Sequence, residues 1–316
     1  MPTISLCMIV KNEEAYLARA LKSVAGLVDE IIIVDTGSTD RTREIASGFT
    51  SKVCSFPWKD DFSDARNYSF SQASMDYCMW MDADDILEEK EKDKFLQLKH
   101  TLSPDTDIVM MKYNTAFDEA GSPSFSYFRE RWIRNSTQYR WVGAVHEVIP
   151  PKGRIIYSEI AISHKKAGAG DPDRNLKIYR KMIAEGKSLD ARQQYYYGRE
   201  LYYHGLYREA VSVLEQFLLS AQGWVENKIE ACSVCADCYY RLGEEEKVKI
   251  IGVFTRNDGD HKLVAVLENS SIEDLSELSG KERADLHRLY PREGEGEGWF
   301  GRTAAEEVIH KFFDRG

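Results

Sequence analysis

Strand-like and helix-like stretches alternate over the first 85 residues, and this alternation restricts the possible folds more than any other feature. Four apolar runs are typical of strands buried on both faces of a sheet: Ile4–Val10, Glu30–Val34, Val53–Phe56 and Tyr77–Asp82. Between them, helical spacing of apolar residues predicts a helix opening at Lys11, one ending near Ala46, and one over Ser63–Ala73. This rhythm predicts an α/β fold, with a mostly parallel sheet and helices on both faces.

The sequence Asp82-Ala83-Asp84-Asp85 ends the fourth apolar run. In an α/β sheet, ligands bind beyond the carboxyl ends of the strands. Carboxylates there can hold a hard divalent cation that bridges the phosphates of a nucleotide. The alternative is a turn that caps a following helix, expected over Ile86–Lys99. The motif alone does not decide between a metal site and a helix cap.

Two further positions near strand ends carry groups that suit a nucleotide. Asp35 follows the second strand, where its carboxylate can accept hydrogen bonds from a base or a ribose. Arg66 lies near the start of a helix, and a guanidinium suits the geometry of a diphosphate. The neighbouring Ser38–Asp40 is alternatively an N-cap cluster. Arg66 alternatively forms a surface ion pair with Asp61 or Asp64.

Four motifs, in order along the chain, resemble the family 2 glycosyltransferases, which have a GT-A fold. The motifs are Ser5–Glu14, Glu30–Asp40, Asp61–Asn67 and Trp80–Asp85. The nearest likeness is to bacterial members with an attached tetratricopeptide domain, including S-glycosyltransferases that modify peptide cysteines. Lipopolysaccharide-core glucosyltransferases share the opening motifs. The resemblance implies a Rossmann-like GT-A domain over residues 1–166.

This resemblance implies a UDP-sugar as donor, with UDP-glucose as the expected one, and Mn²⁺ or Mg²⁺ as cofactor. The residues implied to hold the nucleotide are Lys11, Asn12, Glu13, Asp35, Arg66 and Asp82. Asp82 and Asp84 are implied to hold the cation, with Asp84 as the direct ligand, and the cation offsets charge on the departing UDP. Family members of this kind invert the anomeric centre by one in-line displacement, so a base must take the acceptor's proton.

The second half of the domain changes to strands rich in aromatic and basic residues. Strands are expected over Ile108–Tyr113, Tyr127–Arg134 and Tyr139–Val148. The last contains a Trp-x-Gly-x-Val-His-Glu run that the relatives share, in which His146 and Glu147 are the candidate bases. Glu147 offers the carboxylate that most such enzymes use, and His146 titrates in a suitable range. The alternative is that both side chains only brace a strand end.

His164 matches a later histidine of the family that could contact the metal or the diphosphate, although a single histidine is more often structural. Trp132, Arg134 and Trp141 are candidates to line an acceptor groove. Alternatively, the aromatic residues belong to the core, as strand aromatics usually do. The expected acceptor is a peptide, a protein or a saccharide.

Four helices are predicted after a hinge-like linker at Gly168–Asp173. They cover Arg174–Glu185, Arg192–His204, Tyr207–Ser220 and Asn227–Arg241. Three positions recur at the same offset and resemble tetratricopeptide repeats: Gly198, Tyr202 and Gly205 match Ala236, Tyr240 and Gly243. With fewer than three complete repeats, residues 172–248 are expected to pack on the catalytic domain or on a second subunit. Recognition of a peptide acceptor and homodimerisation are the expected roles.

Cys232, Cys235 and Cys238 have the short spacing that thiolate metal sites use. Because they fall on one predicted helix, with no fourth cysteine nearby, we expect them to pack as small apolar residues.

Residues 249–316 depart from the transferase pattern and are predicted to form a small α+β tail. Two strands are expected to pair as a hairpin around Asn257-Asp258-Gly259: Lys249–Phe254 and Leu263–Leu267. Two stretches faintly resemble the carboxyl end of soluble inorganic pyrophosphatases: Asp260–Val266 and Gly298–Ile309. Thr255 stands where that family has its first metal-binding aspartate, so an active pyrophosphatase is not expected.

Composition excludes several classes of protein. The net charge of −10 argues against a general nucleic-acid binder. No apolar run approaches the roughly 20 residues that span a bilayer, and the amino terminus lacks the features of a signal peptide. Six cysteines in 316 residues do not suggest a disulfide framework, so the cytoplasm is the expected compartment.

The sequence therefore predicts a metal-dependent, inverting hexosyltransferase, with two rivals. A repeat-based binding protein with a degenerate transferase domain would have no chemical need for Asp35, Arg66, Asp82 and Asp84. A nucleotidyltransferase would normally carry a glycine-rich, basic loop after the first strand, where this chain has Lys11-Asn12-Glu13-Glu14.

Overall fold

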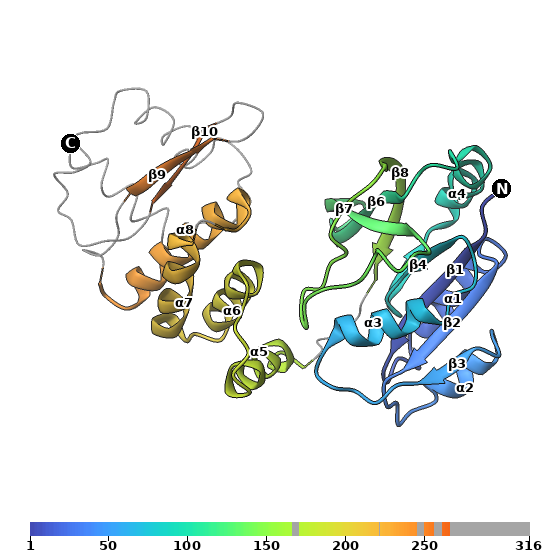
Figure 1. Ribbon diagram of the computed structural model, residues 1–316, viewed down its shortest axis with the longest axis horizontal. Helices are drawn as coiled ribbons and strands as arrows, with labels where there is room; N and C mark the ends of the chain where they lie inside the picture. Colours follow the sequence, from blue (N-terminus) through green and yellow to red (C-terminus); the bar gives the residue numbers. More distant parts are fainter. Residues whose placement is uncertain (166–170, 221, 245–249, 256–260, 266–316) are drawn as a thin grey trace. The chain divides into compact units, whose positions relative to one another are not determined.

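The computed structural model describes the chain apart from residues 166–170, 221, 245–249, 256–260 and 266–316 (Figure 1). The chain divides into two compact units, Met1–Pro172 and Asp173–Gly316. The first unit is a sheet flanked by helices, and the described part of the second is a run of helices followed by two strands. The predicted boundaries at residues 166, 172 and 248 stay a prediction, because much of the predicted tail lies outside the described residues.

One eight-stranded mixed sheet forms the first unit, in the order β3-β2-β1-β4-β7-β6-β8-β5. The strands are β1 Ile4–Val10, β2 Glu30–Asp35, β3 Val53–Ser55, β4 Tyr77–Trp80, β5 Asp85–Leu87, β6 Ile108–Phe117, β7 Pro123–Arg134 and β8 Ile155–His164. β1 is parallel to β2 and β4, and β2 is parallel to β3. β7 is antiparallel to β4 and β6, β6 is parallel to β8, and β5 is antiparallel to β8. The predicted parallel strands are therefore confirmed, and the second half adds antiparallel pairs.

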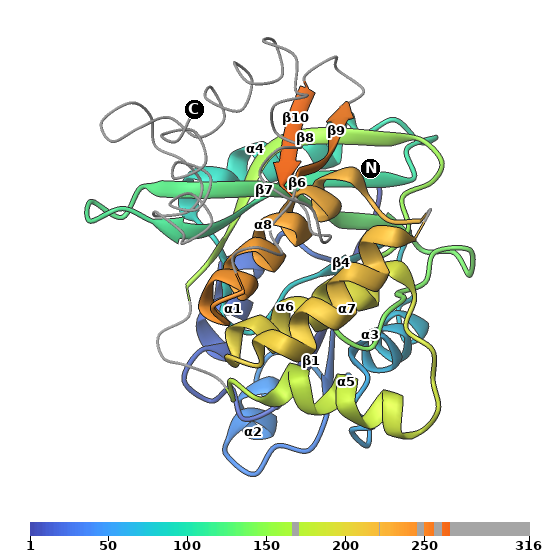
Figure 2. The ribbon, with the colours of Figure 1, turned by 90° about the vertical axis from the view of Figure 1, so that its left-hand side faces the viewer.

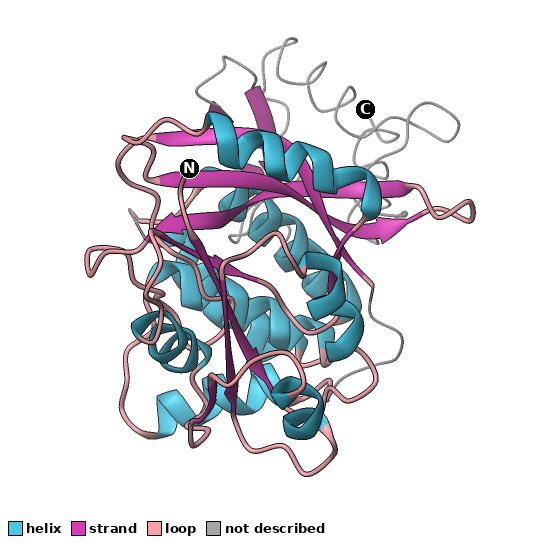
Figure 3. Cartoon of the chain, turned by 90° about the vertical axis from the view of Figure 1, so that its right-hand side faces the viewer, coloured by secondary structure: helices cyan, strands magenta, loops and turns pink. Residues whose placement is uncertain are grey.

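Different helices cover the two faces of this sheet, as predicted (Figure 3). On one face, Leu6 of β1 belongs to a core that includes Leu21 of α1 and Phe95 of α4. On the other face, Cys7 packs in a cluster with Tyr68 of α3. The helices are α1 Leu17–Val24, α2 Thr42–Ser47, α3 Phe62–Ser71 and α4 Glu89–Thr101. The alternation of side chains along β1 thus separates the two cores.

The predicted helix over Ile86–Lys99 is wrong at its start. Asp85–Leu87 forms the short strand β5, and α4 begins only at Glu89. The N-cap residue of α4 is Glu88, which makes no side-chain cap hydrogen bond, so the aspartates do not cap this helix. Residues Asp85–Leu87 form a strand because they pair with β8, which lies far along the sequence. The local spacing of apolar residues carries no information about that partner, so it predicted a helix instead.

Two other local predictions are also wrong. The helix expected to open at Lys11 begins at Leu17, because Asn12 takes a left-handed backbone conformation with φ of 56°. The expected strand Tyr139–Val148 is a loop that makes one antiparallel bridge, between Val142 and Val148. Strand β8 follows that loop.

The helices of the second unit begin and end within one or two residues of the predicted positions. Its helices are α5 Arg174–Ala184, α6 Ala191–Tyr203, α7 Tyr207–Leu219 and α8 Val225–Arg241. α7 packs against both α6 and α8, as Figure 2 shows from the side of this unit. Gly198 of α6 lies so close to Leu214 of α7 that an added Cβ would collide with the leucine side chain. The recurring small residue therefore permits close helix packing.

Cys232, Cys235 and Cys238 are all buried in α8, and burial raises the pKa of each thiol. This supports the prediction that they pack as apolar residues. Beyond α8, β9 Ile250–Thr255 and β10 His261–Ala265 pair antiparallel, as the hairpin prediction requires. The predicted turn at Asn257–Gly259 and the rest of the predicted α+β tail, from residue 266 onward, lie outside the described residues. Within the described part of the chain, no helix is both long enough and apolar enough to cross a membrane.

Candidate active site

The first unit gathers most of the predicted site residues at one edge of its sheet. β1, β2 and β4 run parallel, and Val10 at the end of β1 pairs with Asp35 at the end of β2. Asp82 follows β4 after one residue. The loops that leave these three strands therefore lie next to one another, although their sequences are far apart.

Arg66 connects two of the other predicted site residues. It projects from α3, its Nε donates to Glu147 Oε1 at 2.6 Å, and its Nη2 donates to Asp82 Oδ1 at 2.8 Å. The guanidinium is buried against the rings of Trp80 and Trp141, and its carbon lies 4.8 and 5.0 Å from their centroids. Such a cation is fixed in position by two carboxylates and two aromatic faces.

The alternative prediction, a surface ion pair between Arg66 and Asp61 or Asp64, is therefore wrong. Asp61 instead caps α3, where its side chain accepts a hydrogen bond from the backbone N–H of Asp64. Asp64 lies 3.8 Å from Lys59, in an exposed pair.

A second cluster contains Asp84, Asp85 and His164. One possible ligand atom from each residue lies within 4.8 Å of the other two. His164 Nδ1 is 3.4 Å from Asp84 Oδ1 and 3.2 Å from Asp85 Oδ1. His164 reaches the cluster because β8 pairs with β5 in the register that places it opposite Asp85. Carboxylate oxygens and an imidazole nitrogen are atom types that bind divalent cations, so this cluster is the candidate region for a metal.

Asp82, Asp84 and His164 differ in how their surroundings affect ionisation. Burial opposes ionisation of Asp82, but the charge and hydrogen bond of Arg66, together with the charges of Arg131 and His164, outweigh burial and lower the pKa of Asp82. Burial raises the pKa of Asp84, and the neighbouring charges of Asp82 and Asp85 raise it further. The hydrogen bond with Asp85 raises the pKa of His164. The cluster therefore concentrates negative charge that a cation would relieve.

Asp35 is buried and bonded to its own loop. Its carboxylate accepts hydrogen bonds from the backbone N–H groups of Gly37, at 3.3 Å, and Ser38, at 3.1 Å. Arg43 of α2, which the sequence did not single out, donates to Asp35 Oδ2 at 3.3 Å. Asp35 thus shapes the loop at the end of β2.

The loop with Lys11, Asn12 and Glu13 is tied to the loop after β2. The backbone N–H of Asn12 donates to Ser38 Oγ at 2.9 Å, and its side-chain oxygen accepts from the N–H of Thr39 at 2.7 Å. The N–H of Glu13 donates to a threonine of α2. Lys11 is exposed at the start of the loop.

The N-cap alternative for Ser38–Asp40 is wrong, because the N-cap residue of α2 is Arg41 and it makes no side-chain cap hydrogen bond, although Asp40 just before it bonds to the start of the helix. The carboxylate of Asp40 accepts from the N–H of Thr42, the first residue of α2, at 2.9 Å.

The remaining candidates separate into site, core and distant positions. Glu147 joins the site through Arg66, and His146 beside it has a left-handed backbone with φ of 52°. Trp132 is fully buried against Phe95, so the core alternative is correct for it. Trp141 is also buried, but its ring covers Arg66.

Arg134 is not near the site. It pairs with Tyr77 at the opposite end of β4 and bonds to Asp107 at 3.0 Å.

Tyr113 and Arg131 lie close to the site and were not found from the sequence, and Asp85 was included in the aspartate motif without a role of its own. Tyr113 donates to Asp85 Oδ1 at 2.8 Å, and Arg131 donates to Asp85 Oδ2 at 3.2 Å. Asp85 belongs to that motif, so its position was a usable signal. Tyr113 and Arg131 come from β6 and β7, and only the strand order brings them to β4 and β5.

Comparison with known families agrees with this geometry. The sequence profile of "Glycosyl transferase family 2" matches residues 5–161. Residues 5–161 are a family 2 glycosyltransferase domain. The mixed sheet of this transferase domain, with helices on both faces, has the GT-A arrangement expected for the family.

Curated relatives match about half of this chain. A TPR repeat-containing protein of Synechococcus elongatus is 35% identical over 150 residues, which are 47% of this chain and 36% of the relative. The SPbeta prophage-derived glycosyltransferase SunS of Bacillus subtilis is 32% identical over 155 residues, or 46% of this chain and 34% of SunS. The chain thus matches about a third of the length of these relatives.

Solved structures match this chain at lower sequence identity than the curated relatives. Glucosyl-3-phosphoglycerate synthase from Mycobacterium tuberculosis, in complex with Mg²⁺ and UDP, is 28% identical with a TM-score of 0.30. That match covers 35% of this chain and 44% of the synthase. TarS of S. aureus is 14% identical with a TM-score of 0.43, over 83% of this chain and 60% of TarS.

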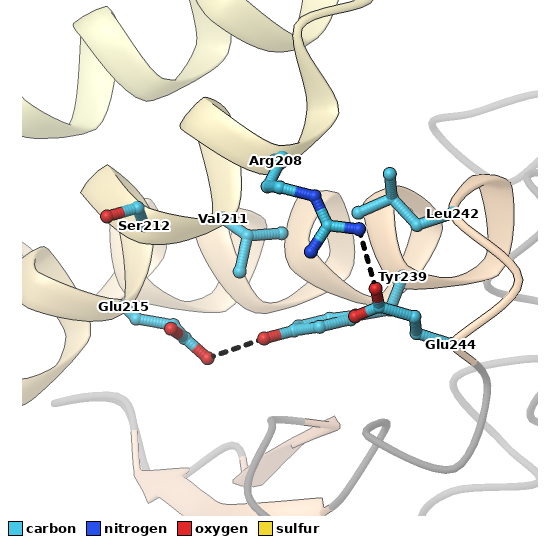
Figure 4. Close-up of a pocket in the computed structure, with 7 residues that line it drawn as sticks. All are labelled: Arg208, Val211, Ser212, Glu215, Tyr239, Leu242 and Glu244. Carbon is cyan, nitrogen blue, oxygen red and sulfur yellow. Dashed lines mark hydrogen bonds and ion pairs between the residues drawn. The ribbon is translucent and has the colours of Figure 1, made fainter.

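Outside the transferase domain, a pocket lies between α7 and α8 of the helical unit (Figure 4). Its lining consists of Arg208, Val211, Ser212, Glu215, Tyr239, Leu242 and Glu244. Arg208 pairs with Glu244 at 2.7 Å, and the hydroxyl of Tyr239 donates to Glu215 at 3.0 Å. These polar groups bond to one another, so the pocket does not add to the candidate active site.

Proposed function

We propose that the first unit transfers a hexose from a UDP-sugar to an acceptor, with a divalent cation and with inversion at the anomeric carbon. The observation that carries this proposal is the position of Arg66, which joins Asp82 and Glu147. These three residues come from three separate stretches of sequence, and their meeting at the ends of the parallel strands favours a site for chemistry over a degenerate domain.

Asp82, Asp84 and His164 are proposed to hold Mn²⁺ or Mg²⁺. Supporting this, Asp84 and His164 place possible ligand atoms within 4.8 Å of each other, and carboxylate oxygens suit both ions. When bound, the cation would neutralise the charge that builds on the departing diphosphate. Asp82 is held by Arg66 on one oxygen, which fixes its carboxylate at the edge of the sheet.

The nucleotide is proposed to bind against the loops that follow β1 and β2. Lys11, Asn12 and Glu13 come from the first loop, and Asp35 holds the second in shape. The hydrogen bonds between Asn12 and the second loop support this, because they fix both loops before a ligand arrives. Arg66 would add a positive charge for the diphosphate from a position that needs no further ordering.

Glu147 is proposed as the base that takes the acceptor's proton, in preference to His146. Its carboxylate bonds to Arg66, which also bonds to Asp82, so Glu147 shares a partner with a proposed metal ligand. A base must lie within hydrogen-bond reach of the proton that it removes, so the residue fixed in the site is the better candidate.

UDP-glucose is the proposed donor, and a peptide, a protein or a saccharide is the proposed acceptor. The motif resemblance supports the uridine nucleotide, and a 32% identical relative is named a glycosyltransferase. The helical unit would recognise a peptide acceptor or join two copies of the chain. One relative is named for its TPR repeats, which accords with the repeat pattern of these helices.

Calorimetric titration of UDP, GDP and ADP, each with Mn²⁺ and with a chelator, tests the proposal. Metal-dependent binding that is selective for UDP is the expected result, and it would justify assays of UDP-sugars with peptide and glycan acceptors. No binding of any nucleotide would contradict it. The helical repeats would then be the place to look for function.

A further inference from the structure

Asp85 differs from the other carboxylates of the motif because it is fully buried and surrounded by donors. Its Oδ1 accepts from the hydroxyl of Tyr113 at 2.8 Å and lies 3.2 Å from Nδ1 of His164. Its Oδ2 accepts from the backbone N–H of Asp82 at 3.1 Å and from Arg131 at 3.2 Å. A carboxylate has about four lone-pair sites, so these four partners leave none for a cation.

Arg131 balances the charge of Asp85 and is also fully buried. Its guanidinium carbon lies 3.8 Å from the centroid of the Trp80 ring and 4.4 Å from that of Tyr113. Among the described residues, its Nε and Nη2 have no hydrogen-bond partner, so the rings hold that side of the cation. A buried ion pair is a weak source of stability, which points to an organising role for this one.

The contacts of Asp85 reach two proposed metal ligands on separate elements. Nδ1 of His164 is 3.0 Å from the hydroxyl of Tyr113 and 3.2 Å from Asp85, which are both nearer than Asp84 at 3.4 Å. A proton on Nδ1 would be shared with these oxygens and would leave the lone pair on Nε2 for a metal. On its other side, Asp85 holds the backbone of Asp82.

We propose that Asp85 is a positioning residue for the metal site and is not itself a ligand. It holds His164 in the Nδ1–H form and fixes the backbone at Asp82, and Arg131 and Tyr113 in turn hold Asp85. This inference rests on the proposed function, because it takes Asp82, Asp84 and His164 as the cation's ligands. Groups that orient ligands in this way typically change metal affinity about 10–100-fold.

Titration of the protein with Mn²⁺ alone, below the unfolding temperature, tests this inference. Asp85→Asn replaces one acceptor oxygen with an amide donor, and we expect a loss of Mn²⁺ affinity of about 10–100-fold. Asp29→Asn is the matched control, since it removes the carboxylate partner, at 2.6 Å, of the buried Lys99 near the opposite ends of the strands. Asp29→Asn should leave Mn²⁺ affinity within about twofold of the wild type, even if it lowers stability as much as Asp85→Asn does.

Tyr113→Phe is a milder variant in case Asp85→Asn does not fold. It keeps the ring beside Arg131 and removes only the hydroxyl that contacts Asp85 and His164. A smaller loss of Mn²⁺ affinity is expected. Tyr77→Phe is its control, because that buried hydroxyl donates to the backbone carbonyl of Thr106, away from the cluster.

Nitrogen-15 spectra of histidine report the tautomer of His164 without any metal. The wild type should carry the proton on Nδ1, and Asp85→Asn should shift the population toward Nε2–H. Wild-type Mn²⁺ affinity in both Asp85→Asn and Tyr113→Phe would overturn the inference and leave the proposed function standing. An Nε2–H form in the wild type would also overturn it. A wild-type protein that bound neither Mn²⁺ nor UDP would overturn the proposed function and this inference together.

Discussion

Arg66 is a buried cation with two carboxylate partners, and this limits what it can do when a nucleotide binds. Its Nε and Nη2 are bonded to Glu147 and Asp82, and its guanidinium packs against two tryptophan rings. A diphosphate would therefore have to share the charge of Arg66 with these carboxylates. We therefore expect Arg66 to couple Asp82, a proposed metal ligand, to Glu147, the proposed base.

Asp84→Asn tests the metal at the level of one residue. The change removes the charge of a proposed direct ligand but keeps the size of the side chain, so metal-dependent UDP binding should be lost with the fold intact. Calorimetry with Mn²⁺ and with chelator measures this, and the unfolding temperature serves as the control for folding. Unchanged metal-dependent affinity would remove Asp84 from the site.

Glu147→Gln tests the base. The amide cannot take a proton, so transfer should fall about 10²–10⁴-fold, while Mn²⁺-dependent UDP binding persists. Turnover of a UDP-sugar, followed by release of UDP, provides the measurement. His146→Asn is the matched control, because asparagine tolerates the left-handed backbone found there, and it should retain transfer. If instead His146→Asn abolished transfer and Glu147→Gln did not, His146 would be the base.

At the scale of elements, the helical unit depends on the close approach of α6 and α7. Gly198→Ala would push a methyl group into Leu214, and overpacking of this kind costs about 1–3 kcal/mol. Denaturant unfolding should therefore show a lower midpoint for the helical unit. In Gly198→Ala/Leu214→Ala the clash is removed, so the double variant should lose less stability than the sum of the single changes. Full additivity would show that Gly198 does not act through Leu214.

For the whole molecule, the sequence predicted what depends on local pattern and missed what depends on distant pairing. The helices of the second unit and the parallel strands of the first follow apolar spacing, so their positions agree with the structure. Strand β5 was missed because it depends on β8, and Tyr113 and Arg131 were missed because they reach Asp85 only through the strand order. Arg66, Asp82 and Glu147 were found through motifs, but no pattern indicated their direct contact.

The response of the first unit to acid depends on Glu30, which connects β2 to two loops. Burial would raise the pKa of Glu30, but hydrogen bonds from Lys52, Ser5 and Ser74 outweigh it and lower the pKa from 4.5 to about 2. A carboxylate whose pKa is lower in the folded than in the unfolded protein stabilises the fold at pH values above its pKa in the unfolded chain. That stabilisation is lost as the pH falls from 4.5 toward 2. Glu30→Gln should therefore destabilise the unit at neutral pH, by at most about 3 kcal/mol.

Urea unfolding of Glu30→Gln and the wild type between pH 7 and pH 3 measures this contribution. The two proteins should differ most at neutral pH and converge as the pH falls below 4.5, because the wild type then loses the ionised carboxylate. Glu44→Gln is the control, since the pair of Glu44 with Arg41 is exposed, and it should match the wild type throughout. A difference for Glu30→Gln that stayed constant with pH would assign its effect to packing instead of charge.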